Sequence, residues 1–249
     1  MITRRSFLGA CGLAVLAGRC GGWTGGGSPS SVRGRRWAMV VDLEVCSKVR
    51  GCTACADACH AAHNVPRIAN VRHDVKWIWK EPIHRILAVP DSRLLPARLQ
   101  SSEALVFCNH CDDPPCVRVC PAGATWRRDD GIVMMDQHRC IGCRYCIAAC
   151  PYGSRSFNWS DPREHLAGTL SDYPTRTKGV VEKCTFCVER IAEGRAPACV
   201  EACEANALVF GDANDPSAEV SRLVSERFSL RRREELGTRP QVHYLVGYR

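Results

Sequence analysis

The arrangement of the cysteines limits the possible folds of this chain more than any other feature. The 249 residues include 18 cysteines, and all except Cys11 and Cys20 fall into four groups of four. The groups are Cys46, Cys52, Cys55 and Cys59; Cys108, Cys111, Cys116 and Cys120; Cys140, Cys143, Cys146 and Cys150; and Cys184, Cys187, Cys199 and Cys203. With no cysteine left over, this pattern predicts sites that are each built from four thiols.

The third group has the spacing C-x2-C-x2-C-x3-C-P in the stretch CIGCRYCIAACP. This spacing places three sulfurs on one tight turn, where Gly142 relieves the crowding, and the fourth about one helical turn further on. Bacterial two-cluster ferredoxins hold 4Fe-4S clusters with such a run, and its fourth cysteine ligates the neighbouring cluster. One run is therefore half of a pair, and the chain is predicted to carry its clusters in pairs.

The other groups keep this plan with altered spacing. The second reads C-x2-C-x4-C-x3-C-P and the fourth C-x2-C-x11-C-x3-C. In the first group five residues separate Cys46 from Cys52, although Gly51 still precedes the second cysteine. The ligand role of Cys46 therefore has the weakest support. Lys48 and Arg50 lie in this longer loop, and two interpretations stay open: they raise the potential of a nearby cluster, or they form a solvated surface.

Crosswise ligation of the ferredoxin kind predicts four 4Fe-4S clusters, each with three cysteines from one group and one from another. The expected sets are Cys108, Cys111, Cys116 and Cys150; Cys140, Cys143, Cys146 and Cys120; Cys46, Cys52, Cys55 and Cys203; and Cys184, Cys187, Cys199 and Cys59. This pairing nests the first and fourth groups around the second and third.

Zinc and disulfides compete with this interpretation. Zinc sites usually need two cysteine pairs a dozen or more residues apart, whereas the third group places its four cysteines within eleven residues. Cysteines this close in sequence are also poorly placed to form useful disulfides. His60 and His110 lie beside expected ligands, but every group is complete without them, so we expect them to be neighbours of a site or surface residues.

The expected fold class is α+β, loop-rich, with two interleaved bacterial ferredoxin-like modules that each hold two 4Fe-4S clusters. Strands are predicted at 37–45, 75–79, 104–107, 131–136 and 207–210, with a closing strand or extended tail at 241–246. Residues 60–107 are expected to form a loop that covers the surface or docks a partner. Asp215 and Pro216 are predicted to cap a helix whose apolar face is Val220, Leu223, Val224 and Phe228.

Five segments follow from this plan. They are a signal and linker at 1–36, the first cysteine group with the insertion at 37–107, a ferredoxin-like module at 108–151, the fourth group completing a second module at 152–212, and a C-terminal helix and tail at 213–249.

The first residues resemble a twin-arginine export signal: Arg4 and Arg5 precede an apolar run and then small residues. Export in the folded state suits a protein whose clusters are inserted in the reducing cytoplasm. We therefore expect a periplasmic protein, peripheral on the outer face of the cytoplasmic membrane, with Cys11 and Cys20 belonging to the signal. A frayed basic terminus followed by a short buried helix is the alternative.

The net charge of +8 is concentrated at the same end. The first 36 residues contain six arginines and no acidic residue, so the rest of the chain is nearly neutral. Cluster charge would make the loaded body acidic, which argues against nucleic-acid binding. No stretch of the sequence is apolar over the 18 residues that a membrane span requires.

Iron that is fully ligated by thiolate and sulfide has no open position for a substrate, and no Ser/His/Asp or paired-carboxylate arrangement accompanies the cysteines. The expected role is thus one-electron transfer without catalysis of its own. A periplasmic redox sensor without a membrane partner is a second hypothesis.

The four groups in this order, with the twin-arginine start, resemble the four-cluster iron-sulfur subunits of the dimethyl sulfoxide, polysulfide and tetrathionate reductase type, over roughly residues 37–212. Local stretches such as GCTACADACHAAHNVP, VKWIWKEP, CRYCIAACPYGSRSF, TKGVVEKCTFCVER, PACVEAC and GDANDP are most similar to the iron-sulfur subunits of DsrMKJOP complexes of dissimilatory sulfur metabolism. The x5 spacing at Cys46 departs most from the general pattern.

This resemblance implies docking on an NrfD-like, quinone-reactive, multi-pass membrane subunit. It also implies a second partner, either a multihaem cytochrome c or a molybdopterin catalytic subunit, between which the sequence does not choose.

Overall fold

The computed structural model describes residues 34–49, 51–87, 93, 95–166, 168 and 171–247. The chain divides into a unit of Met1–Ser30 and a unit of Ser31–Arg249, and the second contains everything described below. The expected export signal and most of the linker, together with Arg50, lie outside the described residues.

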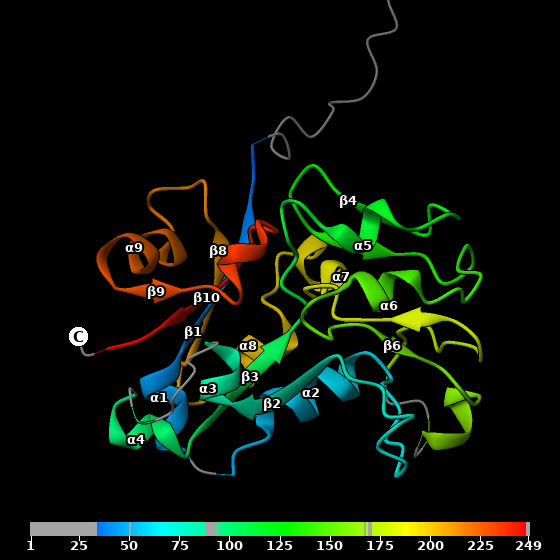
Figure 1. Cartoon of the computed structure of the whole chain (residues 1–249), viewed down its shortest axis with the longest axis horizontal. Helices are drawn as coiled ribbons and strands as arrows, with labels where there is room; N and C mark the ends of the chain where they lie inside the picture. The colour runs from blue at the N-terminus through cyan, green and yellow to red at the C-terminus, as the bar shows by residue number, and fades with distance from the viewer. Residues whose placement is uncertain are drawn as a thin grey trace, which may run out of the picture. The chain divides into compact units, whose positions relative to one another are not determined.

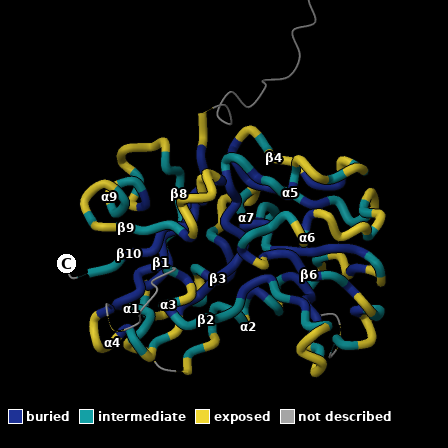
Figure 2. The backbone as a smooth tube through the Cα atoms, viewed as in Figure 1, coloured by how far each residue is buried: buried dark blue, intermediate teal, exposed yellow. Residues whose placement is uncertain are grey.

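A four-stranded sheet in the order β8-β1-β10-β9 joins segments that are far apart in sequence (Figure 1). Its strands are β8 (Leu208–Asp212), β1 (Trp37–Asp42), β10 (Val242–Leu245) and β9 (Ser229–Leu230). β1 runs parallel to β10 and antiparallel to β8. The expected closing segment at 241–246 is therefore an inner strand, and the buried tube along β1 and β10 in Figure 2 marks the interior of this sheet.

The predicted strand at 37–45 is three residues too long. The Asp42 carboxylate accepts the backbone N–H groups of Glu44 and Val45, which begins helix α1 (Leu43–Lys48). Cys46 consequently lies on a helix rather than beyond a strand. A carboxylate that accepts these N–H groups stabilises the first turn of a helix, so the chain leaves the sheet after Asp42.

Helix α9 (Glu219–Glu226) covers one face of the sheet through Val220, which packs with Ala38, Val40 and Leu245. The prediction that Asp215 and Pro216 cap this helix is wrong: the helix starts three residues later, after Ala218, and has no side-chain cap. Asp215 instead accepts the backbone N–H of Ser217 in a turn. Phe228 lies beyond the helix and is 68% exposed.

Short elements fill the rest of the described chain, and the expected mixed, loop-rich class is confirmed at this level. Three two-stranded antiparallel sheets pair β2 (Ile78–Pro82) with β3 (Glu103–Phe107), β4 (Thr125–Arg127) with β5 (Val133–Met135), and β6 (Ser156–Phe157) with β7 (Val181–Glu182). The helices are α2 (Ala54–Ala62), α3 (Ile83–Ile86), α4 (Ala97–Gln100), α5 (Pro115–Arg118), α6 (Tyr145–Ala149), α7 (Val188–Ala192) and α8 (Ala198–Glu201), with 3-10 turns at Pro162–His165 and Glu234–Leu236.

Residues 60–107 are not the surface loop that the sequence suggested. Trp77, Ile83, Ile86 and Leu99 from this segment are at most 1% exposed and belong to the main core. The predicted strand at 75–79 is displaced to Ile78–Pro82. Prolines and turn residues interrupt the apolar pattern of this segment, so the sequence did not indicate that it contributes to the core.

A buried polar network holds this segment to the rest of the unit. The Glu182 carboxylate, which is fully buried, forms an ion pair with Arg176 at 2.7 Å and accepts the Trp77 indole N–H at 2.7 Å. Asn158 donates to the same carboxylate, and Arg176 also donates to the backbone carbonyl of His63. Removing one member of such a buried pair leaves the other charge uncompensated.

We therefore expect Glu182→Gln to lower the free energy of unfolding by about 3–5 kcal/mol, because the buried Arg176 loses its counter-charge. Denaturant unfolding of the anaerobically purified chain measures this loss. The matched control is Asp161→Asn, which removes the negative charge of the exposed Asp161–Arg163 pair and should cost far less, because exposed ion pairs contribute little to stability. Equal losses for the two variants would contradict the role of the network.

Candidate metal centres

Each cysteine group forms a turn with the same handedness. The residue just before the second cysteine has a positive φ in every group: +72° at Gly51, +41° at His110, +70° at Gly142 and +58° at Phe186. This conformation reverses the chain, so that the thiols before and after it face the same side. The first group makes this turn in spite of its longer spacing, which the sequence left open.

Two of these turns place bulky residues in a conformation that favours glycine. A left-handed residue other than glycine costs about 1–3 kcal/mol and persists only where its surroundings fix it. His110 and Phe186 are buried, and their rings stack with centroids 3.7 Å apart. His110 Nδ1 also accepts the backbone N–H of Val133 at 3.1 Å. The stack ties the turn of the second group to that of the fourth.

The structure brings the cysteines together in sets that mix the groups. We call them set A (Cys108, Cys111, Cys116, Cys150), set B (Cys120, Cys140, Cys143, Cys146), set C (Cys46, Cys52, Cys55, Cys203) and set D (Cys59, Cys184, Cys187, Cys199). Sets A, C and D each line one cavity. Cys120, Cys140 and Cys146 pack in one apolar cluster that also contains Cys116 of set A, and Cys143 is exposed, so set B is grouped by the expected crosswise ligation and not by a shared cavity.

The sets follow one another in a line. The Cys146 thiol of set B and the Cys116 thiol of set A are close enough to influence each other's charge. Cys184 of set D is coupled in the same way to Cys108 of set A, and Cys199 of set D to Cys55 of set C. The order is therefore B, A, D, C. In Figure 1, α5 and α6 beside set B lie on the opposite side of the unit from α1, which carries Cys46 of set C.

The environment of the thiols fits a metal cluster rather than free cysteine. Burial, reinforced by neighbouring thiols, raises the pKa of Cys55 to about 11 and that of Cys111 to about 12. Four thiols that share a cavity cannot all ionise unless a cation core balances them. Sulfur is also the donor that iron-sulfur clusters take. Both the donor set and the crowding agree with 4Fe-4S binding.

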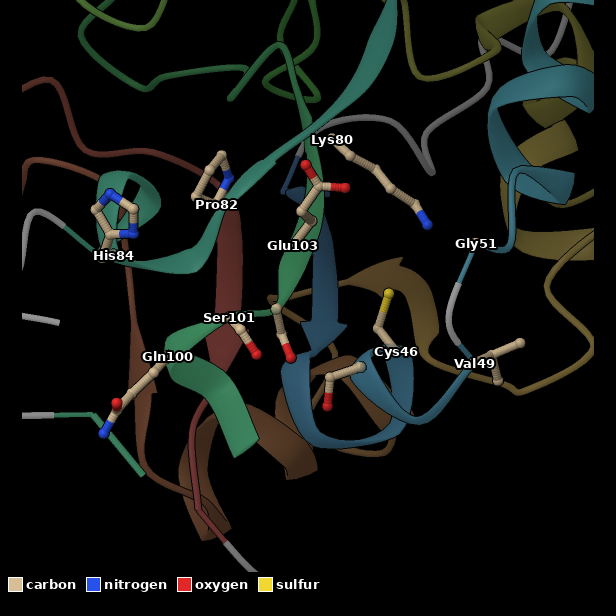
Figure 3. Close-up of a pocket in the computed structure, with 11 residues that line it drawn as sticks. Cys46, Val49, Gly51, Lys80, Pro82, His84, Gln100, Ser101 and Glu103 are labelled. Atoms are coloured by element: carbon tan, nitrogen blue, oxygen red, sulfur yellow. The ribbon is translucent and has the colours of Figure 1, made fainter. Parts of the chain in front are cut away.

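Set C has the widest cavity of the three, about 380 Å³, and it adjoins a second, polar pocket (Figure 3). Figure 3 shows the Cys46 thiol and the Lys80 side chain directed into this pocket. Burial raises the pKa of Cys46, and the positive charge of Lys80 opposes that rise. Lys48 is exposed, and among the described residues Lys80 is a cation near Cys46, which the sequence reasoning missed because it comes from β2.

Neither of the histidines singled out in the sequence lines the cavity of set D; His63 does. Its Nε2 lies 2.8 Å from the Glu189 carboxylate and its Nδ1 lies 3.9 Å from the Cys59 sulfur. Burial opposes protonation of His63, but hydrogen bonds to Cys187 and Glu189 outweigh it and raise the pKa to about 9. The side chains of His63, Cys187 and Glu189 could together hold a metal ion, but Cys187 already belongs to set D.

Comparison with known proteins identifies the kind of centre. A family model described as a 4Fe-4S dicluster domain matches residues 104–164 and 171–213. The chain is 43% identical over 242 residues to the Hdr-like menaquinol oxidoreductase iron-sulfur subunit 1 of Archaeoglobus fulgidus, covering 87% of this chain and 86% of that protein.

Two further relatives cover similar lengths. The menaquinone reductase iron-sulfur cluster-binding subunit of Nitratidesulfovibrio vulgaris is 39% identical over 237 residues, covering 84% of this chain and 88% of that protein. The putative iron-sulfur subunit of a dimethyl sulfoxide reductase from Halobacterium salinarum is 37% identical over 222 residues, covering 85% of this chain and 79% of that protein.

The chain belongs to this family of iron-sulfur electron-transfer subunits. Its 4Fe-4S chemistry agrees with what the cysteine pattern predicted, and its role as a subunit of an oxidoreductase complex agrees with what the family resemblance implied. Within the described part of this iron-sulfur subunit, no helix combines the length and the apolar character needed to cross a bilayer.

The turns predict unequal effects for two glycine substitutions. A Cβ at Gly142 would lie 2.3 Å from the Gly179 carbonyl oxygen, whereas a Cβ at Gly51 would have no neighbour within 4 Å. We expect Gly51→Ala to lower the free energy of unfolding by about 1–2 kcal/mol, which is the strain of a left-handed backbone at alanine. Gly142→Ala should lower it more, because the backbone of one loop must also move. Thermal unfolding and iron content per chain measure both, and equal losses would contradict the close approach.

Proposed function

We propose that this chain carries single electrons through four 4Fe-4S clusters held by sets A, B, C and D. The observation that supports it best is the line of four cysteine sets, each mixing two groups, that extends from α6 to α1. In this proposal the sixteen cysteines are the ligands, Cys46 included. The sets correspond to two interleaved ferredoxin-like modules, one at 108–151 and one built from 37–107 with 152–212.

A 4Fe-4S cluster supplies reversible one-electron chemistry when it is bound. The residues of this chain provide the rest. The left-handed turns aim the thiols at common centres, and apolar side chains such as Phe107 and Trp77 exclude water from set D. The stack of His110 on Phe186 fixes the spacing between the two inner sets.

The partners follow from the relatives and the surface. We propose that the chain takes electrons from, or gives them to, an NrfD-like, quinone-reactive membrane subunit. The other end would serve a multihaem cytochrome c in dissimilatory sulfur metabolism. Two of the relatives are named for menaquinol or menaquinone, which supports a quinone-linked complex. Arg4 and Arg5 support twin-arginine export to the periplasm, with the chain peripheral on the outer face of the membrane.

A molybdopterin catalytic subunit is the alternative second partner. The name of the relative from Halobacterium salinarum, a dimethyl sulfoxide reductase iron-sulfur subunit, supports this alternative. The same four sets of cysteines would serve either complex. The two alternative partners would cover different parts of the surface of this chain, and the electron would pass through the same four sets in either complex.

The surface around set B suits a membrane subunit. Ile141 and Tyr145 flank the exposed Cys143 and are 69% and 63% exposed. Arg144, between them, lies over the Trp159 ring at 4.7 Å. Exposed apolar and aromatic side chains with arginine are the composition of interface centres and of the membrane boundary. We therefore assign the end near set B to the membrane subunit and the end near Lys80 to the other partner.

Crosswise ligation predicts which pairs of cysteine substitutions remove the same cluster and which pairs remove two clusters. The anaerobically purified chain should hold about 16 irons and about 16 sulfides. Cys46→Ser and Cys203→Ser should each remove the same cluster, because both residues belong to set C. The double variant should therefore lose no more iron than either single variant.

The matched control combines Cys46→Ser with Cys150→Ser, which belong to sets C and A. That pair should lose the iron of two clusters, with two distinct changes in the EPR spectrum of the reduced protein. A chain with zinc in place of iron, or additive losses for Cys46 and Cys203, would contradict the ligand sets.

The membrane-facing surface is tested by Ile141→Asp. Burial of an isoleucine contributes about 1.5–3 kcal/mol, so we expect at least about tenfold weaker association with the membrane fraction at unchanged iron content. Val71→Asp is the control, because Val71 is 77% exposed and lines a cleft that contains no cysteine. Equal effects of the two variants would exclude this face as the docking site.

A further inference from the structure

Arg155 is a buried arginine that contacts a cysteine sulfur. It is 4% exposed, and its guanidinium donates to the Cys116 sulfur of set A at 3.0 Å. The same nitrogen donates to the Thr125 hydroxyl oxygen at 2.9 Å, and the other terminal nitrogen lies 3.5 Å from the Met135 sulfur. None of these three partners carries a permanent negative charge.

Other buried arginines of the described chain are neutralised in the usual way. Arg36 pairs with Asp112, Arg176 with Glu182, and Arg232 with Glu81. Among the residues that the structure describes, no carboxylate forms an ion pair with Arg155. An uncompensated buried charge is destabilising by several kcal/mol, so a counter-charge of another kind is required.

Cysteine thiolates are the groups near Arg155 that can carry that counter-charge. The guanidinium already donates to the Cys116 sulfur, and Cys146 is a further thiol near it. Cys116 belongs to set A and Cys146 to set B, which puts the guanidinium between these two neighbouring sets. A 4Fe-4S core with four thiolates is anionic, and reduction adds one further negative charge.

We propose that Arg155 is a positioning residue that raises the reduction potential of the cluster held by set A, and more weakly that of set B. It does so by donating to the Cys116 sulfur and by placing beside the cluster a positive charge that no described carboxylate neutralises. Hydrogen bonds to the sulfurs and nearby charge are the means by which proteins set cluster potentials. The inference rests on the proposed function, because sets A and B must hold clusters.

Thr125 fixes the direction of this guanidinium. Its hydroxyl donates to the Met134 carbonyl at 2.6 Å, so the oxygen faces Arg155 as an acceptor. Thr125 lies on β4 and Met135 on the paired strand β5. The hairpin between the second and third cysteine groups thus orients the arginine that follows the third group.

The test is a redox titration of the full chain, purified anaerobically with its clusters and followed by EPR. For Arg155→Gln we expect the one-electron reduction of one cluster to become at least tenfold less favourable, a shift of about 59 mV to lower potential. Arg155→Lys keeps the charge and loses the fork, so its shift should be smaller. Thr125→Val, which leaves the charge in place, should give a small shift of the same cluster.

The control is Arg231→Gln, which removes a partly buried arginine that pairs with Glu234 and lines none of the cavities of sets A, C and D. It should leave all potentials unchanged. Unchanged potentials in Arg155→Gln at full iron content would overturn the inference, as would equal shifts in Arg231→Gln. If Arg155→Gln does not fold, the reduction potentials of Arg155→Lys and Thr125→Val decide. An unchanged potential in both variants would overturn the inference.

Iron and sulfide analysis separates this inference from the proposed function. A wild-type chain without iron would end the electron-transfer proposal before any potential is measured. A wild-type chain with its full iron and a variant without a shift would remove only the role of Arg155.

Discussion

The burial of thiols in shared cavities governs how this chain can fold. Thiols this close together and this far from water hold their protons at neutral pH, as the raised pKa values of Cys55 and Cys111 indicate. A metal-sulfur core changes that balance because it supplies positive charge where the sulfurs converge. The short helices and turns that carry the cysteines can therefore gain stability by surrounding such cores.

The repeated left-handed turn explains how four dissimilar cysteine spacings build similar sites. A positive φ before the second cysteine is present at Gly51 and Gly142, where glycine adopts it freely, and at His110 and Phe186, where a ring stack holds it. Spacing can therefore vary between Cys46 and Cys52 without loss of the turn.

Charge placement distinguishes the sets more than their cysteines do. Set A has Arg155 in contact with one sulfur, set C has Lys80 at its rim, and set D has the His63–Glu189 pair. Set B lies nearest to exposed apolar side chains. Identical surroundings would give an electron the same energy at every proposed cluster, whereas these different surroundings would give each of them its own potential.

Local sequence was enough to establish the chemistry of this protein. Cysteine spacing is a local property, and it predicted the 4Fe-4S centres and the electron-transfer family, while short apolar runs predicted the strands at 104–107, 131–136 and 207–210. Sequence reasoning failed where distant segments decide the outcome: the strand at 37–45 is ended by the Asp42 cap, and residues 60–107 enter the core because Trp77 meets Glu182 across 105 positions of sequence. Folding places Lys80 beside Cys46 and Arg155 against Cys116, and neither pair could be predicted, since long-range contacts between a charge and a sulfur leave no periodic pattern in the chain.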